Sequence, residues 1–285
     1  MERFAAPTSS QHRRVWINGV CHEDESHAAV AATDHGFVTG DGVFEALKVT
    51  EAGPFAVQRH LNRLSRSSAA MGLPAPDHTR IRAAIDQVLD GWKFSHGRLR
   101  ITYTGGLGPL SSGAPFGPPT LVVAVEPAPL PPASTAIVTS PWTRNEHGAL
   151  AGVKSTSYAE NVRALAYATS RRATEAVFLN TEGNLCEGTG TNIFVVIDGT
   201  IITPPLSSGP LAGITREVIL EWCDVEERDF TLAEARAADE VFLTSSLRDV
   251  QAVQRWDEID LGRTHPVTGR IAATFAERSS AMLDP

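Results

Sequence analysis

One lysine stands where a reactive amine would be useful. Lys154 lies in GVKSTSYAEN, after the small or apolar residues Ala151, Gly152 and Val153, so partial burial is plausible. A lysine amine can lose its proton and attack a carbonyl carbon, whereas an arginine guanidinium stays protonated. The chain has three lysines and 22 arginines, but high GC content of the coding sequence also explains that bias. Because most lysines are surface charges, Lys154 by itself does not establish catalysis.

A carboxylate follows 33 residues later. Glu187 in LCEGTGTNIF lies between Cys186 and a Gly-Thr-Gly turn, at the start of an apolar stretch. A glutamate there either faces solvent in the turn or pairs with a specific partner. A pyridine nitrogen is one suitable partner, because a carboxylate keeps it protonated and lets the ring accept electrons. The residues alone leave both interpretations open.

Two further segments could bind phosphate. LAGITREVILEW places Gly213, Ile214 and Thr215 at the start of a predicted helix, whose first N–H groups and dipole attract anions. Simple N-capping by Thr215 is the alternative. FLTSSLRDV ends a predicted strand in three successive hydroxyls, the last on Ser246, and Arg63 of HLNRL could add a cation. Taken alone, Arg63 is more simply a solvated helix residue.

Other motifs are weak or absent. The segment CHEDESH (21–27) contains possible metal ligands, but so short a polar run favours a solvated turn over a metal site. The sequence contains no dinucleotide-binding fingerprint, no P-loop and no G-x-S-x-G elbow. We therefore expect no metal and no nucleotide.

Composition argues against several classes of protein. The chain is 42% hydrophobic and 20% charged, as globular soluble proteins are. A net charge of −8 and a pI near 5.6 disfavour nucleic acids and acidic membranes as partners. No apolar run is long enough to predict a membrane span, and MERFAAPTSSQHRR lacks the apolar core of a signal peptide. Three widely spaced cysteines favour a reduced, cytoplasmic protein.

The elements that must position these residues are strands mixed with single helices. Strands are predicted at 15–19 (with an Asn-Gly hairpin turn), 43–49, 54–58, 98–104, 120–126, 135–140, 175–180, 192–198, 200–204 and 239–246. Helices are predicted at 60–71 (closed by Gly72), 77–89, from about 158, from 215 and at 271–283. Residues 105–119 form a Gly/Pro/Ser loop of a length that is usually functional or mobile. Because regular βαβ repeats are missing, we expect an α+β (mixed α/β) fold.

A proline-rich segment indicates a domain boundary. EPAPLPPAS, which starts at Glu126, has four prolines in nine residues and is expected to be stiff and extended. We therefore expect a smaller N-terminal α/β domain at 1–126, a linker at 127–134 and a larger C-terminal domain at 135–285.

Taken in this order and spacing, the segments resemble the fold-type IV family of enzymes that use pyridoxal 5′-phosphate (PLP). The resemblance runs from about Val15 to Val253, and its most specific part joins the Glu187 segment to the Gly213 segment. It implies a two-domain fold like that of D-amino acid aminotransferases, with PLP between the domains, and a homodimer. The segments that carry it are DHGFVTGDGVFEALKV, RHLNRL, VKSTSYAEN, EGNLCEGTGTNIFVVIDGTIITPP, LAGITR and DEVFLTSSLRDV.

The resemblance also implies roles for single residues. Lys154 matches the lysine that holds PLP as a Schiff base and moves the substrate proton. Glu187 matches the carboxylate on the pyridine nitrogen, and Leu211 matches the residue packed on the ring. Tyr158 matches a ring-oxygen contact, although its spacing from Lys154 differs by one from the branched-chain enzymes. The implied phosphate ligands are Arg63, Ile214, Thr215 and Ser246.

The resemblance is less specific about the substrate. Phe44 and Glu45 of GDGVFE lie where the family lines its substrate pocket. D-amino acid aminotransferases share this pattern but carry an Arg and a His in the loop that is GGLGPLSSGAPFG here. The substrate carboxylate would then need another partner, for which this chain offers Arg98, Arg100, Arg144 or the backbone at Leu247.

We expect a transaminase that takes the amino group of a D-amino acid or an (R)-amine and passes it to pyruvate or 2-oxoglutarate. Aminodeoxychorismate lyases share the length and much of the pattern, and branched-chain L-amino acid aminotransferases are a further alternative. A PLP-free homologue with a binding role is the alternative from another class, and the presence of both Lys154 and Glu187 argues against it.

Overall fold

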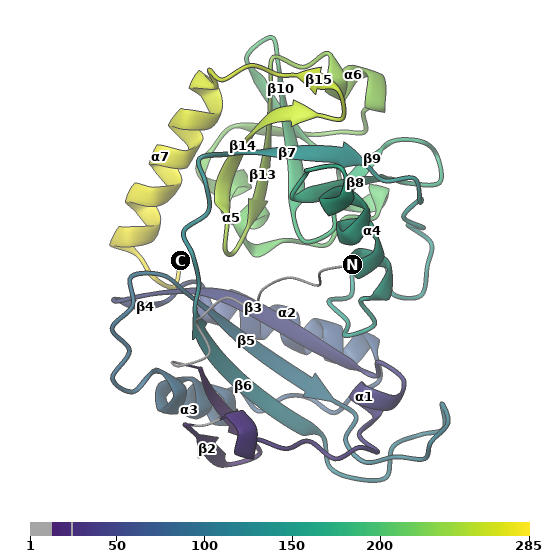
Figure 1. Cartoon of the computed structure of the whole chain (residues 1–285), viewed down its shortest axis with the longest axis vertical. Coiled ribbons are helices and arrows are strands. Elements are labelled where there is room, and N and C mark those ends of the chain that lie inside the picture. The colour runs from purple at the N-terminus through teal and green to yellow at the C-terminus, as the bar shows by residue number, and fades with distance from the viewer. Residues whose placement is uncertain (1–12, 24) are drawn as a thin grey trace. The chain divides into compact units, whose positions relative to one another are not determined.

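The computed structural model describes residues 13–23 and 25–285, which form two compact units (Figure 1). Unit 1 contains the described residues up to Leu130 together with Lys154–Ser157, and unit 2 contains Pro131–Val153 and Tyr158–Leu283. The sequence-based boundaries instead include Lys154–Ser157 in the segment 135–285. Most of MERFAAPTSSQHRR, for which no signal peptide is predicted, and one residue of CHEDESH lie outside the described residues.

Unit 1 is built on an antiparallel sheet. Its strands follow the order β2-β1-β6-β5-β3-β4. The turn of the first hairpin has positive φ at Asn18 (48°) and Gly19 (117°), as the Asn-Gly signal predicts. The strands are β1 (Arg14–Ile17), β2 (Val20–His22), β3 (Gly42–Thr50), β4 (Gly53–Pro54), β5 (Gly97–Thr104) and β6 (Thr120–Pro127).

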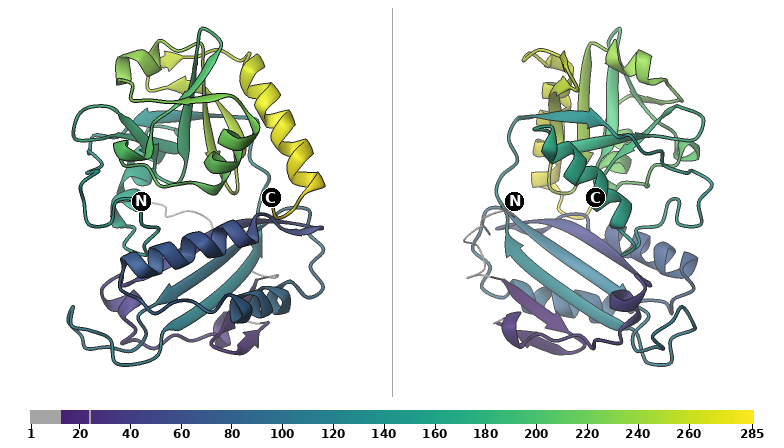
Figure 2. Two further views of the ribbon diagram at one scale, coloured as in Figure 1. Left: turned by 180° about the vertical axis from the view of Figure 1, so that it is seen from behind. Right: turned by 45° about the vertical axis from the view of Figure 1, so that its right-hand side comes forward.

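Two helices, α2 (Val57–Ala70) and α3 (His78–Leu89), cover one face of this sheet, as Figure 2 shows. Side chains alternate along β3, so Val43, Leu47 and Val49 face these helices and are fully buried. Phe44 and the other residues of the same parity face the opposite side of the sheet. A four-residue helix, α1 (His35–Val38), precedes β3.

Unit 2 contains a mixed sheet, whose main path runs β12-β11-β10-β13-β14-β7-β8-β9, with β15 paired to β14. Parallel pairs join β14 to β7, β7 to β8 and β11 to β12. Parallel strands need a crossover, and α4 (Ala159–Ser170) and α5 (Ile214–Trp222) provide two of them. The strands are β7 (Ser134–Thr139), β8 (Glu175–Leu179), β9 (Leu185–Gly188), β10 (Asn192–Ile197), β11 (Thr200–Thr203), β12 (Val225–Glu227), β13 (Glu240–Ser245), β14 (Asp249–Trp256) and β15 (Ile259–Asp260).

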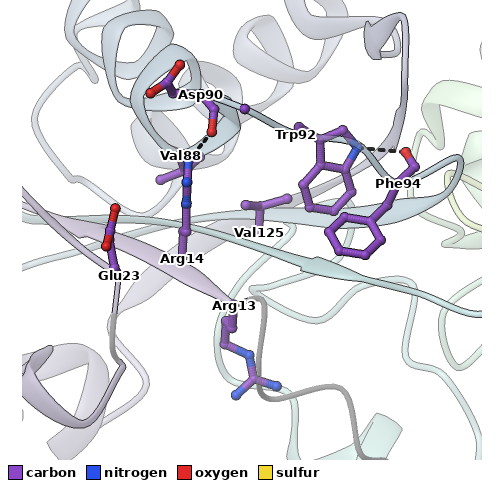
Figure 3. Close-up of a pocket in the computed structure, with 9 residues that line it drawn as sticks. Arg13, Arg14, Glu23, Val88, Asp90, Trp92, Phe94 and Val125 are labelled. Carbon is purple, nitrogen blue, oxygen red and sulfur yellow. Dashed lines mark hydrogen bonds between the residues drawn. The ribbon is translucent and has the colours of Figure 1, made fainter.

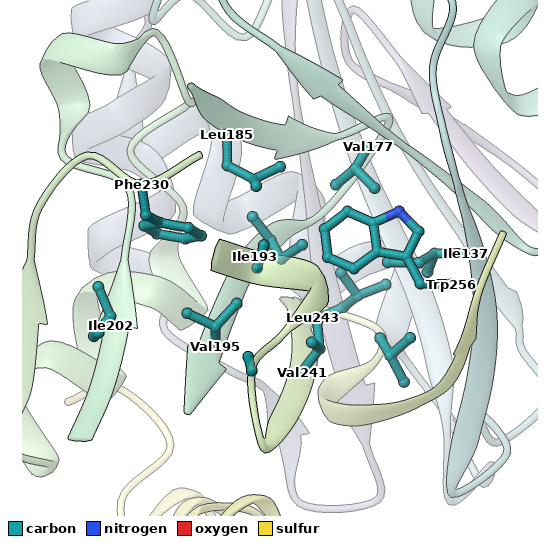
Figure 4. Packing of buried hydrophobic residues seen from close by; sticks show 13 residues of the cluster. Ile137, Val177, Leu185, Ile193, Val195, Ile202, Phe230, Val241, Leu243 and Trp256 are labelled. Atoms are coloured by element: carbon teal, nitrogen blue, oxygen red, sulfur yellow. The ribbon is translucent and has the colours of Figure 1, made fainter. Parts of the chain in front are cut away.

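The core of unit 2 lies on one face of this sheet and packs around Trp256 and Phe230 (Figure 4). On the other face, Phe194 of β10 stacks on Phe242 of β13 with 4.8 Å between ring centroids. The helices α5 and α7 (Pro266–Ala281) contact β13 on this unit. A short α6 (Leu232–Arg236) follows β12. No helix among the described residues is long and apolar enough to span a membrane.

The prediction of a strand at 54–58 is wrong. Only Gly53 and Pro54 pair with β3, and α2 begins at Val57 after Ala56, which adopts a left-handed φ of 56°. The reason is helical periodicity, because Val57 shares one buried face with Leu61 and Leu64. α2 ends at Ala70, and Gly72, with a φ of 72°, follows the C-cap residue Met71, as the sequence predicts.

Several elements were not predicted from the sequence. These are α1, α6, β9, β12, β14 and β15. The last helix begins at Pro266, not at residue 271, because Glu240 accepts hydrogen bonds from the backbone N–H groups of Val267 and Thr268 at 2.8 Å. A carboxylate from a distant strand thus caps the helix N-terminus, and local sequence does not reveal such a cap.

Candidate active site

Lys154 lies along the edge of β3 in unit 1. Its carbonyl oxygen accepts a hydrogen bond from Phe44 N at 2.9 Å, and its own N–H donates to Ser67 Oγ of α2 at 3.3 Å. Thr156 N donates to Gly42 O at 2.8 Å, so the segment after Lys154 pairs with the start of β3. The backbone of Lys154 is therefore held by both a strand and a helix.

The ring of Phe44 contacts two cations of unit 1. Lys154 Nζ lies 4.5 Å from the ring centroid and Arg100 Cζ lies 3.8 Å from it. Arg100 also donates from Nε to Thr102 Oγ1 at 3.1 Å. Arg98, two residues earlier on β5, instead lies 3.4 Å from a carboxylate oxygen of Glu126. The structure therefore brings Phe44, Lys154 and Arg100 together, and it gives Arg98 a partner of its own.

Glu45 points to the opposite side of the sheet from Phe44 and is fully buried against α2. Its Oε1 accepts from Arg63 Nε at 2.8 Å and its Oε2 accepts from Arg63 Nη2 at 2.6 Å. The Nδ1 atom of His60 lies 2.7 Å from Oε2. The sequence suggests Glu45 as a substrate-pocket residue. In the structure, two side chains of α2 engage its carboxylate.

The charges of this cluster are strongly coupled. Burial alone would raise the pKa of Glu45, but the charge and hydrogen bonds of Arg63, with a further contribution from His60, lower it to about 2. Burial lowers the pKa of His60, although Glu45 acts in the opposite direction. Glu45 is thus an ionised partner that orients Arg63.

A surface pocket of about 290 Å³ also lies in unit 1, between the end of α3 and the start of β1 (Figure 3). Trp92 and Phe94 form one wall, and the indole N–H of Trp92 donates to Phe94 O at 2.8 Å. None of the site residues selected from the sequence lines this pocket. The pocket is therefore separate from the cluster around Lys154.

Glu187 extends from β9 in unit 2 and keeps 14% of its side chain exposed. Its Oε2 accepts a hydrogen bond from Leu211 N at 2.9 Å. Its Oε1 lies 3.5 Å from Arg144 Nε, an ion pair without hydrogen-bond geometry. The carboxylate is thus oriented from one side by the backbone of the loop that leads into α5.

Arg144 and Tyr158 surround Glu187 within unit 2. Arg144 donates to Glu160 Oε2 and to Asn161 Oδ1, both at 3.1 Å, and its guanidinium lies 4.3 Å from the ring centroid of Phe178. The hydroxyl of Tyr158 donates to Thr189 O at 2.7 Å. Burial raises the pKa of this hydroxyl, and the charge of Glu187 raises it further.

The predicted phosphate segment is an uncapped helix start. α5 begins at Ile214, and its N-cap residue Gly213 provides no side-chain hydrogen bond. Thr215 is buried in the first turn rather than at the N-cap position. The alternative of N-capping by Thr215 is therefore wrong, and the first N–H groups of α5 receive no side-chain cap from the residue before the helix.

A buried hydroxyl without a partner lies near this helix start. Thr244 is 1% exposed, and within the described residues its Oγ1 has no hydrogen-bond partner. It pairs in register with Asn192, whose Oδ1 would lie 1.9 Å from a Cβ added at Gly213. Ser246 and Leu247 follow in the turn between β13 and β14. An uncapped helix start, a close glycine and an orphan hydroxyl fit a group that bears phosphate oxygens.

Sequence reasoning missed some residues of these clusters. Glu175 is 2% exposed, and its Oε1 accepts from Thr189 N at 2.9 Å, which holds the turn after Glu187. Asn192 and His60 were also not singled out, although Asn192 lies inside the quoted segment LCEGTGTNIF. For these residues, the only signal in the sequence was a polar side chain among apolar neighbours. The described residues contain no cluster that could hold a metal ion.

Comparisons with known proteins agree with this architecture. The family model of amino-transferase class IV matches residues 42–256. A protein of Methanocaldococcus jannaschii, provisionally assigned as a branched-chain-amino-acid aminotransferase, is 32% identical over 84% of this chain and 86% of its own. The bifunctional aminodeoxychorismate lyase / D-amino acid transaminase of Mycobacterium tuberculosis is 30% identical over 88% and 92% of the two chains.

Solved structures lead to the same family. A hypothetical aminotransferase from Mycobacterium tuberculosis in its PLP-bound form has a TM-score of 0.83 and 27% identity, with 92% of this chain and 97% of that chain covered. The present chain belongs to the class IV aminotransferase family. It is an aminotransferase of fold type IV, and its cofactor is PLP, as the sequence resemblance implies.

Proposed function

We propose that this enzyme moves the amino group of a D-amino acid, and also of some (R)-primary amines, to a 2-oxo acid such as pyruvate or 2-oxoglutarate. The contact of Phe44 with both Lys154 and Arg100 carries the proposal, because it puts a cation suited to a carboxylate beside a candidate amine. The GDGVFE pattern and the relative named as a D-amino acid transaminase support the D configuration.

In this proposal, the residues that the family resemblance selects would hold PLP. Lys154 Nζ would hold the cofactor covalently, Glu187 would pair with the pyridine nitrogen and Leu211 would pack on the ring. Tyr158 would contact the ring oxygen. The N–H groups at Ile214 and Thr215 would bind the phosphate, together with Ser246 and Arg63. The uncapped start of α5 and the orphan hydroxyl of Thr244 support this phosphate site.

Different residues of the chain carry out different parts of transamination. Bound PLP supplies a protonated pyridine ring that accepts the electron pair released when the donor loses its α-proton. Lys154 Nζ takes that proton and later returns it, which a neutral amine can do and a guanidinium cannot. The carboxylate of Glu187 keeps the proton on the ring nitrogen, and its hydrogen bond from Leu211 N orients it.

We assign the substrate carboxylate to Arg100 in preference to Arg98 and Arg144. Arg98 already pairs with Glu126, and Arg144 pairs with Glu160 and Glu187. The backbone at Leu247 remains a second donor. Arg100 lies on the same ring as Lys154, so a carboxylate bound there would bring the α-carbon toward the amine.

Two other activities compete with this one. The lyase named in the bifunctional relative would release pyruvate from aminodeoxychorismate, and the branched-chain assignment of the archaeal relative would favour L-leucine as donor. A PLP-free binding protein is not supported, because the chain belongs to a PLP-dependent family. We also propose that the enzyme is a cytoplasmic homodimer, and sedimentation of the purified protein tests the dimeric state.

A half-reaction assay separates the candidates. The holoenzyme is mixed in turn with D-alanine, (R)-1-phenylethylamine and L-leucine, and loss of the visible absorbance band of the bound cofactor is followed without an acceptor. We expect rapid loss with D-alanine. Loss with L-leucine alone would overturn the D-amino acid assignment. Pyruvate release from aminodeoxychorismate, without loss of the band with any donor, would favour the lyase.

A further inference from the structure

The loop that leads into α5 connects the two halves of the proposed cofactor site within unit 2. The backbone N–H of Leu211 donates to Glu187, and the carbonyl oxygen of the same residue accepts from Asn192 Nδ2 at 2.9 Å. Gly213, two residues later, is the N-cap of α5. One short piece of backbone therefore touches both the carboxylate and the helix start.

Asn192 bonds to this piece of backbone at one point and lies close to it at another. Its amide nitrogen bonds to Leu211 O, and its amide oxygen lies so near Gly213 that a Cβ there would come within 1.9 Å. Asn192 is 6% exposed at the first position of β10, where it pairs in register with Thr244 of β13. The side chain is thus fixed by the sheet and in turn fixes residues 211–213.

We propose that Asn192 is a positioning residue that couples Glu187 to the phosphate-binding start of α5, through the backbone of Leu211–Gly213. This coupling rests on the proposed roles of Glu187 and α5. Without the amide of Asn192, the carbonyl of Leu211 loses its buried partner and the loop can rotate. Such rotation would disturb the donor of Glu187 and the N–H groups of α5 together.

The structure offers a matched control. Thr203, 1% exposed, donates from Oγ1 to Ile193 O at 2.8 Å, so it bonds to the residue next to Asn192. Thr203→Val removes one buried hydrogen bond between β11 and β10. It removes no contact of residues 211–213. Asn192→Ala and Thr203→Val should therefore lower the stability of the apo-protein to a similar degree.

The experiment measures PLP affinity of the apo-protein and the pH at which the absorbance of the bound cofactor changes. For Asn192→Ala we expect about tenfold weaker PLP binding and a shifted pH of the spectral change. Thr203→Val should leave both values near those of the wild type. In the Glu187→Gln background, Asn192→Ala should no longer shift the spectral pH but should still weaken PLP binding.

Three results would overturn the coupling: equal effects of the two variants, an unchanged spectral pH in Asn192→Ala, or an undiminished shift in the Glu187→Gln background. Failure of the proposed function has a different signature, because the wild-type protein would then bind PLP without losing its absorbance band when a donor is added.

Discussion

Two carboxylates, one in each unit, are held in opposite ways. Glu45 of unit 1 is fully buried, and Arg63 and His60 engage both of its oxygens. Glu187 of unit 2 is 14% exposed, and Leu211 N and the more distant Arg144 approach it. The first carboxylate is enclosed by its own unit, whereas the second is oriented but remains accessible.

The difference separates a structural carboxylate from one suited to chemistry. A carboxylate with charged partners on both oxygens stabilises the fold around it but cannot exchange a proton near neutral pH. A carboxylate that a backbone N–H orients and that stays partly exposed can accept a further hydrogen bond from a ligand. Sequence position does not distinguish them, since both glutamates follow short apolar or glycine-containing segments.

The largest effect is expected from Lys154→Ala, which tests whether the chemistry of unit 1 belongs to the amine beside Phe44 rather than to the buried carboxylate of Glu45. We expect transamination to fall by at least about a thousandfold and borohydride to lose its ability to fix PLP covalently. Lys48→Ala is the matched control, because Lys48 also lies near an aromatic ring, 5.3 Å from the centroid of Phe55. Covalent fixation of PLP in Lys154→Ala would show that the amine is misassigned.

Glu187→Gln should have the next largest effect. The amide keeps an acceptor for Leu211 N but cannot hold a proton on the pyridine nitrogen, so kcat should fall by about a hundredfold or more. PLP should still bind. Glu160→Gln removes a partner of Arg144 whose side chain is 77% exposed, and it should change kcat little. Stopped-flow measurement of the half-reaction checks this, and equal rates for Glu187→Gln and the wild type would exclude the pyridine contact.

Glu45→Gln should act on stability first. Breaking a buried ion pair leaves Arg63 without its counter-charge, so the free energy of unfolding at pH 7 should fall by about 3–5 kcal/mol. Glu126→Gln removes the partner of Arg13 and Arg98 at a half-buried position and should cost less than about 1 kcal/mol. Urea denaturation measures both, and similar losses would remove the contrast between Glu45 and a peripheral carboxylate.

The same variant changes the dependence of stability on pH. The pKa of Glu45 is lowered to about 2 in the folded chain, below the ordinary value of 4.5. Its ionised form therefore stabilises the wild type above the ordinary pKa, and this contribution disappears as the pH falls toward 2. The difference in stability between wild type and Glu45→Gln should narrow over that range. A constant difference would contradict the lowered pKa.

Much of this architecture follows from local sequence. The predicted helix at 77–89 occurs as α3, with Asp77 as its N-cap, and the Asn18–Gly19 turn and the helix after Gly213 also occur. Local rules are sufficient there because caps and tight turns depend on a few neighbouring residues. They also indicated Lys154 and Glu187 as reactive types.

Other features depend on contacts between distant segments. Glu240 caps α7 from another element, and Ala56 adopts a left-handed φ at the start of α2. The bidentate contact of Arg63 with Glu45 joins residues 18 positions apart. Asn192 reaches Leu211 over 19 positions. Hydrophobic periodicity and secondary-structure propensity do not predict hydrogen bonds between such distant residues.

The smallest effect on activity is expected from substitution of the arginines of β5. These two cations again differ in their surroundings. Arg98 is paired with Glu126, whereas Arg100 lies on the ring of Phe44 beside Lys154. Arg100→Ala should raise KM for the amino-acid donor about tenfold with little change for an amine that lacks a carboxylate. Arg98→Ala should leave both values within about twofold, since exposed ion pairs contribute little. If Arg98→Ala instead raised KM for the carboxylated donor alone, the substrate carboxylate would belong to Arg98.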